Sequence, residues 1–192
     1  MSLWNNMGMD KYKNRKVVLV DLDDREIGVA PLIEAHRDGG LKHRAFSLIL
    51  INKVGNKVKI LLQRRALSKP VFPGYWANTC CYNLAPGEEY LERARSRVKE
   101  EMGIDLGDGP LSILYKFSYE AEGLNGWCEN EVDTVIIGEW MGKVVPNLDE
   151  VVDYKWLEWE EMKVDMQNNP DIYSPWWKMI VNEGRVEKYI GE

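Results

Sequence analysis

Cysteine and histidine are both scarce in this chain of 192 residues, which contains three cysteines and two histidines. Three cysteines, two of them adjacent at Cys80 and Cys81, do not form a disulfide framework, so we expect a reducing, cytoplasmic setting. No signal peptide and no apolar run long enough to span a bilayer is visible in the sequence. We therefore expect no membrane partner.

Positive charge is in the minority, since 25 lysines and arginines stand against 31 aspartates and glutamates, for a net charge of −6. A general binder of nucleic acid is therefore not expected. An anionic small molecule would need a local basic pocket, and Arg64, Arg65 and Lys69 supply cations close together in the sequence. We expect a small-molecule partner and a monomer or homodimer.

The pattern of apolar residues predicts a mixed α/β (α+β) fold. Alternating or β-rich runs predict strands over residues 16–21, 26–29, 45–52, 57–63, 111–121, 130–140 and 153–157. Apolar residues at helical spacing, helped by Pro at a first turn, predict helices over residues 31–36, 88–102, 159–166 and 176–188. These elements, without internal repeats, predict a single domain over residues 17–192 after a flexible leader over residues 1–16.

The helix expected over residues 88–102 ends in two glutamates, and Gly103 follows where a C-cap glycine would stand. Glu100 and Glu101 leave a helix in different directions, so they cannot both face one point. With Arg97 one turn earlier, they fit a solvated, salt-bridged helix face. Two glutamates before a glycine, after a Gly-rich loop, also match a site that holds Mg²⁺ bridging to a diphosphate. Both interpretations stay open.

The two histidines of the chain, His36 and His43, lie within one short segment. A single histidine is more often structural than a ligand, but a pair is less easily accidental, and neutral imidazole is the commonest metal ligand. Glu129 and Glu131 would point to the same face of an extended strand. Two histidines and two such glutamates form a plausible transition-metal set, although the glutamates alone also fit a charged strand edge.

The adjacent cysteines Cys80 and Cys81 follow a turn-rich segment that contains Trp76 and Asn78. Buried cysteine most often acts as a small hydrophobic residue. Basic residues nearby would favour a thiolate here. A thiol in an apolar, Trp-rich pocket can also act as a general acid or base on carbon.

Taken together, these motifs resemble the type I isopentenyl-diphosphate isomerases, a branch of the Nudix superfamily. The resemblance runs from Val17 to about Arg185. It is carried by His36, His43-Arg44-Ala45-Phe46-Ser47, Arg65, Lys69, Phe72-Pro73-Gly74, Asn78-Thr79-Cys80-Cys81, Glu100-Glu101-Met102-Gly103-Ile104, Tyr119, Glu129-Asn130-Glu131 and Ser174-Pro175-Trp176. It implies a Nudix fold, with a mixed sheet packed between helices, and the conversion of isopentenyl to dimethylallyl diphosphate.

The resemblance implies a role for each matching residue. Cys81 corresponds to the cysteine that exchanges a proton with one end of the allylic unit. Glu131, helped by Tyr119, corresponds to the acid on the opposite face of the substrate. Trp176 corresponds to the aromatic wall that stabilises a tertiary carbocation through its π-face.

The same resemblance implies two metal sites and a basic pocket. Glu101 corresponds to the ligand of a Mg²⁺ that binds with the diphosphate. A second divalent metal, Mn²⁺, Mg²⁺ or Zn²⁺, would be held by His36, His43, Asn83, Glu129 and Glu131. The implied phosphate-binding cations are Arg65, Lys69 and Arg97.

Three positions depart from the family pattern. Asn83 stands where the family has a metal-binding histidine, and an amide oxygen binds borderline metals more weakly than imidazole does. Leu32 stands where bacterial members often place a phosphate-binding lysine. Arg97 stands where hydrolases of the superfamily place a glutamate, which argues against a pyrophosphohydrolase.

Two alternatives to an isomerase therefore remain. A Nudix hydrolase would use Glu100, Glu101 and a metal-bound water to cleave a diphosphate-containing substrate. A non-catalytic diphosphate-binding homologue would be explained by Asn83. Turnover of isopentenyl diphosphate, release of phosphate, or binding without either would separate the three.

Overall fold

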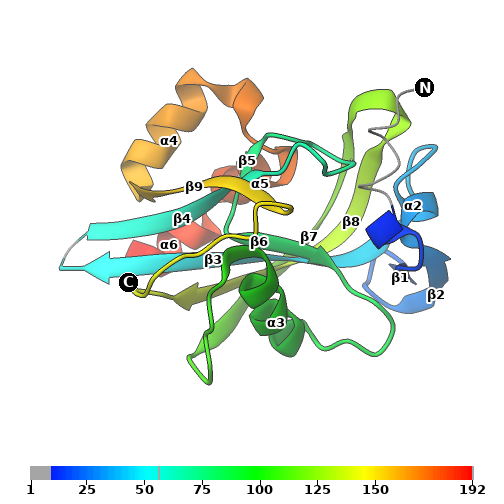
Figure 1. Ribbon diagram of the computed structural model, residues 1–192, viewed down its shortest axis with the longest axis horizontal. Helices are drawn as coiled ribbons and strands as arrows, with labels where there is room; N and C mark the ends of the chain where they lie inside the picture. The colour runs from blue at the N-terminus through cyan, green and yellow to red at the C-terminus, as the bar shows by residue number, and fades with distance from the viewer. Residues whose placement is uncertain (1–9, 56, 192) are drawn as a thin grey trace.

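The computed structural model describes residues 10–55 and 57–191, and its centre is one nine-stranded mixed sheet (Figure 1). The strands are β1 (Lys16–Val20), β2 (Glu26–Pro31), β3 (His43–Val54), β4 (Lys57–Arg65), β5 (Trp76–Ala77), β6 (Cys80–Asn83), β7 (Leu111–Glu122), β8 (Cys128–Glu139) and β9 (Val151–Glu158). The predicted mixed α/β fold is confirmed.

The helices cover both faces of this sheet. They are η1 (Asp10–Tyr12), α2 (Leu32–Ala35), α3 (Tyr90–Met102), η2 (Leu124–Gly126), α4 (Trp159–Asn168), η3 (Pro170–Ile172), α5 (Pro175–Asn182) and α6 (Arg185–Gly191). Helix α3 lies on one side of the sheet, and α4 and α5 lie on the other (Figure 1). Within the described residues, every helix is too short or too polar to cross a membrane.

Side chains of the central strands alternate between two hydrophobic cores, as the two-residue period of a strand requires. In β3, Ile49 and Ile51 join the core beneath α4, α5 and α6, whereas Leu48 and Leu50 join the core beneath α3. The same alternation in β4 and β8 buries the sheet on both faces. Such burial explains why these strands read as continuous apolar runs in the sequence.

The pairing of β3 brings the sequence motifs together on one face of the sheet. Its first half pairs with β6, so that Ser47 lies opposite Cys81. Along its other edge β3 runs parallel to β8, where His43 lies opposite Glu131. Because side chains alternate, these odd-numbered residues all project toward the face that α5 covers.

Helix α3 ends where the sequence indicated. Gly103 caps it in the left-handed conformation, with φ +64°, and its N–H donates to the carbonyl of Lys99. A Cβ atom at this position would lie 2.3 Å from the carbonyl oxygen of Val145, so only glycine fits without a shift of the backbone.

Two expectations about the ends of the chain need revision. The single helix expected over residues 176–188 is two helices, because Gly184 adopts φ +74° between α5 and α6. The expected leader falls partly outside the described residues, at residues 1–9. Its remainder is docked on the domain, since the Tyr12 side chain is buried and Lys11 forms an ion pair with Glu150.

Candidate active site

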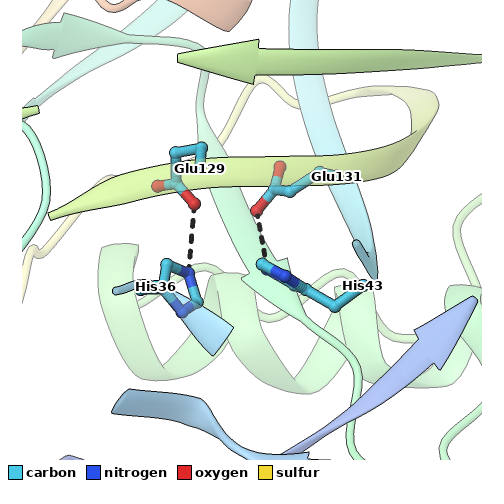
Figure 2. A group of neighbouring side chains, drawn as sticks. All are labelled: His36, His43, Glu129 and Glu131. Atoms are coloured by element: carbon cyan, nitrogen blue, oxygen red, sulfur yellow. Dashed lines mark ion pairs between the residues drawn. The ribbon is translucent and has the colours of Figure 1, made fainter. Parts of the chain in front are cut away.

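Four side chains from three elements converge near the start of β8; we call His36, His43, Glu129 and Glu131 the acceptor cluster. His36 follows α2, His43 begins β3, and the two glutamates come from β8. One ligand atom from each residue lies within 4.8 Å of the others, and all four residues are buried. The prediction that Glu129 and Glu131 share one face of a strand is confirmed (Figure 2).

The hydrogen bonds behind the two imidazoles fix their orientation. His36 Nδ1 donates to the carbonyl of Leu32, and His43 Nδ1 donates to the carbonyl of Leu41, each at 2.7 Å. In the neutral rings this leaves both Nε2 atoms as acceptors that face the carboxylates (Figure 2). A hydrogen bond from the ring nitrogen that does not bind the metal is typical of metal-binding histidines.

Acceptors face acceptors in this cluster, which is the arrangement that a divalent cation satisfies. His36 Nε2 lies 3.0 Å from Glu129 Oε2, and that buried oxygen forms no hydrogen bond. Burial, and then the charge of Glu131, raises the pKa of Glu129. Burial opposes protonation of His36, but the neighbouring Glu129 outweighs it and raises the pKa of the imidazole. Nitrogen and carboxylate donors together fit a transition metal or Mn²⁺.

Asn83 lies at the edge of the acceptor cluster, at the position where the family resemblance implied a ligand. Its Nδ2 donates to Glu131 Oε1 at 2.6 Å and lies 3.1 Å from His43 Nε2. The amide therefore supplies hydrogen-bond donors to two acceptors of the cluster. Ligation of a metal by Asn83 would require the amide to turn, so that its oxygen replaces its nitrogen.

Glu131 has further partners that hold its charge. Tyr119 donates its hydroxyl to Glu131 Oε2 at 2.6 Å. Burial would raise the pKa of Glu131, but His43 and the Tyr119 hydroxyl outweigh it and lower the pKa. The expected assistance of Glu131 by Tyr119 thus has a direct hydrogen bond behind it.

Cys81 and Trp176 meet at one amide oxygen. The Cys81 thiol donates to Asn78 Oδ1 at 3.1 Å, and the indole N–H of Trp176 donates to the same atom at 3.0 Å. Cys81 is partly exposed, while Cys80 is fully buried on the opposite face of β6, in the core beneath α3. Asn78 therefore orients both the thiol and the aromatic ring.

The surroundings of Cys81 keep it protonated. Burial, and then the charge of Asp133, raises the pKa of the Cys81 thiol to about 12. The expectation that nearby basic residues favour a thiolate is therefore wrong, because loss of hydration outweighs the Arg65 charge. Ser47 stands between the two groups, since its hydroxyl donates to Asp133 at 2.7 Å and lies 3.6 Å from the Cys81 sulfur.

A second group of charged side chains surrounds the end of α3; we call Lys69, Arg97, Glu101 and Glu150 the paired cluster. Glu101 is 1% exposed and forms ion pairs with both Lys69, at 3.0 Å, and Arg97. Glu150 forms ion pairs with the same two cations. Burial opposes ionisation of Glu101, but Lys69 and Arg97 outweigh it and lower the pKa of the carboxyl. The two carboxylates are therefore already neutralised.

The two glutamates at the end of α3 behave differently, as their spacing indicated. Glu100 is half exposed and pairs with Arg93 and Arg97, which fits the solvated helix face. Glu101 is buried and faces the paired cluster. The Arg65 guanidinium, by contrast, donates to the carbonyls of Phe72 and Val71 and stacks on the Trp176 ring at 5.1 Å, with no carboxylate partner in the described part of the chain.

One cavity of about 70 Å³ connects these groups. It is lined by the sequence-predicted site residues His36, Arg65, Lys69, Cys81, Asn83, Arg97, Tyr119, Glu129, Glu131 and Trp176, whereas the predicted His43 is buried behind this wall. Glu101 does not line the cavity itself; it lies behind its ion-pair partners Lys69 and Arg97, which do. The residues singled out in the sequence therefore surround one space, from opposite ends of the chain.

Some residues of the site were missed in the sequence. Asn78 stood in a quoted motif without a role, and its position just before the cysteines was the only signal. Asp133 continues the alternation of Glu129 and Glu131 by one more step, which could have placed it on the same face. Glu150, Tyr12 and Arg15 lie far from any motif, so only the folded chain reveals them.

Comparison with known sequences gives a family and named relatives. The NUDIX domain family matches residues 41–177. The isopentenyl-diphosphate Delta-isomerase 1 of Aromatoleum aromaticum is 40% identical over 167 residues, which cover 87% of this chain and 90% of that protein. The isopentenyl-diphosphate Delta-isomerase of Mycolicibacterium vanbaalenii is 41% identical over 160 residues, or 83% of this chain and 86% of that protein.

Comparison with solved structures gives the same fold. A crystal structure of DR0079 from Deinococcus radiodurans superimposes with a TM-score of 0.69 at 18% identity, covering 88% of this chain and 98% of that one. The MutT protein of Methanosarcina mazei superimposes with a TM-score of 0.59 at 18% identity, covering 77% and 95% of the two chains.

Proposed function

The chain belongs to the NUDIX family and, within it, to the isopentenyl-diphosphate Delta-isomerases, and on this basis we propose that it converts isopentenyl diphosphate to dimethylallyl diphosphate. The reaction moves a double bond by one position. A proton is added to the terminal methylene carbon, which leaves a tertiary carbocation. A second proton is then removed from the carbon two positions away, so the proton count is unchanged.

The observation that carries this proposal is that Cys81 and Glu131 line the same cavity from two strands on either side of β3. Two acid–base groups on different sides of a bound substrate are what the proton movements need. Cys81 holds a proton and Glu131 is ionised, so one group can donate while the other accepts. The roles exchange in the reverse reaction.

The carbocation between these groups must be kept from water, which would capture it. Trp176 is buried and lines the cavity with Tyr119, their ring centroids 6.5 Å apart. The Asn78 hydrogen bond and the edge of Phe72 fix the indole plane. A fixed π-face beside a developing cation stabilises it by a cation–π interaction.

The acceptor cluster suits a resident divalent metal, and a bound metal there would hold Glu131 in place and make its carboxyl more acidic. Mn²⁺, Mg²⁺ and Zn²⁺ are the candidates, and Asn83 in place of a third histidine favours the harder Mn²⁺ or Mg²⁺. We propose that Glu101 binds a separate Mg²⁺ only together with the diphosphate. The anionic phosphates would draw Lys69 and Arg97 away from Glu101 and free its oxygens.

The hydrolase alternative is weaker in the folded chain. Metal-assisted hydrolysis would need ionised, accessible carboxylates on α3 to hold a metal and activate a water. Glu100 is paired with Arg93 and Arg97 on the exposed side of α3, which leaves Glu101 as the one carboxylate of this pair that is beside Lys69. Arg97 also stands where the superfamily's hydrolases place an acid. The expected cytoplasmic setting and the absence of a nucleic-acid partner stay predictions.

The proposal is tested by following isopentenyl diphosphate with the purified protein by proton and phosphorus NMR, with Mg²⁺ and Mn²⁺ present. We expect dimethylallyl diphosphate and no inorganic phosphate. Release of phosphate or pyrophosphate would favour a hydrolase instead. Binding of the substrate without any product would favour the non-catalytic homologue, with Asn83 as the cause.

A further inference from the structure

The segment before β1 forms part of the wall of the site. Lys11 forms an ion pair with Glu150 of the paired cluster at 2.7 Å. Tyr12 is buried, and Arg15 donates to the backbone carbonyl of Asn83 at 3.2 Å. The segment thus contacts the site at three successive points along 11–15.

Arg15 brings a positive charge that no carboxylate balances within residues 10–55 and 57–191. Its guanidinium lies 4.3 Å from the centroid of the Tyr82 ring and uses one N–H for the Asn83 carbonyl. Burial, and then repulsion from Arg97 and Arg93, lowers the pKa of Arg15. Lys69 and Arg97, in contrast, are already paired with Glu101 and Glu150. Four N–H donors of a half-buried cation therefore remain for an anion.

Tyr12 brings a polar atom that is also without a hydrogen-bond partner in the described chain. Its side chain is 6% exposed, and its hydroxyl oxygen is buried. A buried tyrosine hydroxyl normally finds a partner, because leaving it unpaired is unfavourable. The Tyr12 hydroxyl can therefore donate a hydrogen bond to a bound ligand.

Tyr12 and Arg15 stand where two hollows meet. The cavity that contains Cys81 measures about 70 Å³, which is too small for a whole prenyl diphosphate. A neighbouring hollow of about 250 Å³ is lined by Lys11, Arg93 and Glu150. Tyr12, Arg15, Tyr82 and Arg97 line both. A substrate with its prenyl end beside Cys81 would place its anionic end at this junction.

We propose that Arg15 and Tyr12 bind the diphosphate group of the substrate together with Arg65, the other arginine of the cavity wall that has no carboxylate partner among the described residues. This inference rests on the proposed function. It also accounts for Leu32, which lines the same cavity without a charge at the position where bacterial members often carry a lysine. The backbone N–H of Leu32 donates to the Arg15 carbonyl at 2.8 Å, so the two residues are neighbours. Arg15 supplies from the adjacent segment the cation that position 32 lacks.

The test uses the full chain and four variants: Arg15→Gln, Arg15→Lys, Tyr12→Phe and, as the matched control, Lys13→Gln. Lys13 is an exposed cation in the same segment. Binding of pyrophosphate with Mg²⁺ is measured by titration calorimetry. The KM and kcat for isopentenyl diphosphate are measured alongside, and melting temperatures without ligand report any loss of stability.

We expect Arg15→Gln to weaken pyrophosphate binding about tenfold or more, since it removes a charge-assisted contact. Arg15→Lys should recover part of that affinity because it keeps the charge. Tyr12→Phe should weaken binding about threefold. KM should rise in parallel while kcat changes less than about twofold, because the contact is the same in the ground and transition states. Lys13→Gln should match the parent.

A purely structural role for Arg15, through Tyr82 and the Asn83 carbonyl, predicts a lower melting temperature with unchanged pyrophosphate affinity. That result would overturn the inference, as would a parent protein that binds no pyrophosphate. If the parent binds pyrophosphate, and Arg15→Gln weakens that binding, but isopentenyl diphosphate is not isomerised, the inference stands and the proposed function fails.

Discussion

The acceptor cluster and the paired cluster each contain two carboxylates, but they differ in whether the protein itself balances the negative charge. In the acceptor cluster, Glu129 and Glu131 face the Nε2 atoms of two imidazoles. The N–H group of each ring, at Nδ1, points away from the glutamates, toward a backbone carbonyl. In the paired cluster, Glu101 and Glu150 face Lys69 and Arg97 and are neutralised within the protein.

The difference indicates when each site can take a cation. The acceptor cluster lacks positive charge until a metal or a proton arrives, so it suits a resident ion. The paired cluster has its counter-charges built in, so we expect Mg²⁺ to bind there only when another anion attracts Lys69 and Arg97. A diphosphate is such an anion, and the proposed Mg²⁺ site would therefore depend on bound substrate.

The largest expected effect distinguishes Cys81 from Cys80, which lie on opposite faces of β6. Cys81→Ala should lower turnover of isopentenyl diphosphate by about 10³-fold, because it removes a proton-exchanging group while leaving the fold intact. Cys80→Ala, on the α3 side, should keep its turnover and lose about 1 kcal/mol of unfolding free energy. Rate measurements with urea unfolding check both. A dead Cys80→Ala variant beside an active Cys81→Ala variant would reverse the assignment.

Acid should weaken the paired cluster. Lys69 and Arg97 outweigh burial and hold the pKa of Glu150 well below its usual range. A lowered pKa in the folded state gives stability that is complete above the unfolded value of about 4.3 and is lost as the pH falls further. Glu150→Gln should therefore be less stable than the parent by about 2 kcal/mol at pH 6.

The gap between Glu150→Gln and the parent should shrink as the pH falls from 4 toward 2, since a protonated Glu150 resembles the amide. Urea unfolding at several pH values measures it. The exposed Glu139→Gln serves as the control and should follow the parent throughout. A gap that is constant with pH would show that the ion pairs of Glu150 do not supply the stability.

A third histidine should strengthen the acceptor cluster. Asn83→His replaces an amide that donates to Glu131 with an imidazole that can ligate, so Zn²⁺ should bind about tenfold more tightly or better. Turnover should be equal or faster. Metal titration with a competing chelator measures the affinity, and Asn182→His, on the exposed side of α5, controls for adding a histidine elsewhere. Unchanged affinity in Asn83→His would mean that position 83 does not face the metal.

The smallest effect concerns Mg²⁺ in the paired cluster. Glu101→Gln should reduce the enhancement of diphosphate binding by Mg²⁺ several-fold, on the order of 1 kcal/mol, because an amide is a weaker ligand for a hard cation. Glu100→Gln, which changes the neighbouring exposed carboxylate, should have less effect. Pyrophosphate titrations at increasing Mg²⁺ concentration provide the comparison. The same Mg²⁺ dependence in Glu101→Gln and the parent would remove Glu101 from the site.

The sequence predicted most of the fold because its signals were local. β3 and β8 follow from β-rich apolar runs, the apolar face of α3 follows from helical spacing, and Gly103 marked the end of α3. The break at Gly184 was missed because the apolar spacing continues across it, from Ile180 to Val186. A glycine inside such a pattern does not by itself show which conformation it takes.

The candidate site was predictable where motifs carried it and not where folding assembled it. His36, His43, Glu129 and Glu131 were identified by residue type and spacing, and the structure brings them together. The protonated state of Cys81 was not predictable, because it depends on burial and on Asp133 across β3. The sharing of Lys69 and Arg97 between Glu101 and a second carboxylate was likewise not predictable, because Glu150 is 49 residues from Glu101 and belongs to no motif.

The proposed reaction requires Cys81 and Glu131 to exchange protons with carbon from two sides of one substrate. Incubation of isopentenyl diphosphate with the parent protein in D₂O, followed by NMR, tests it most directly. We expect dimethylallyl diphosphate with deuterium in a methyl group, and loss of product in both Cys81→Ala and Glu131→Gln. Phosphate release from an unrearranged prenyl chain would contradict this mechanism. So would product without deuterium, or formation of product by either variant at the parent's rate.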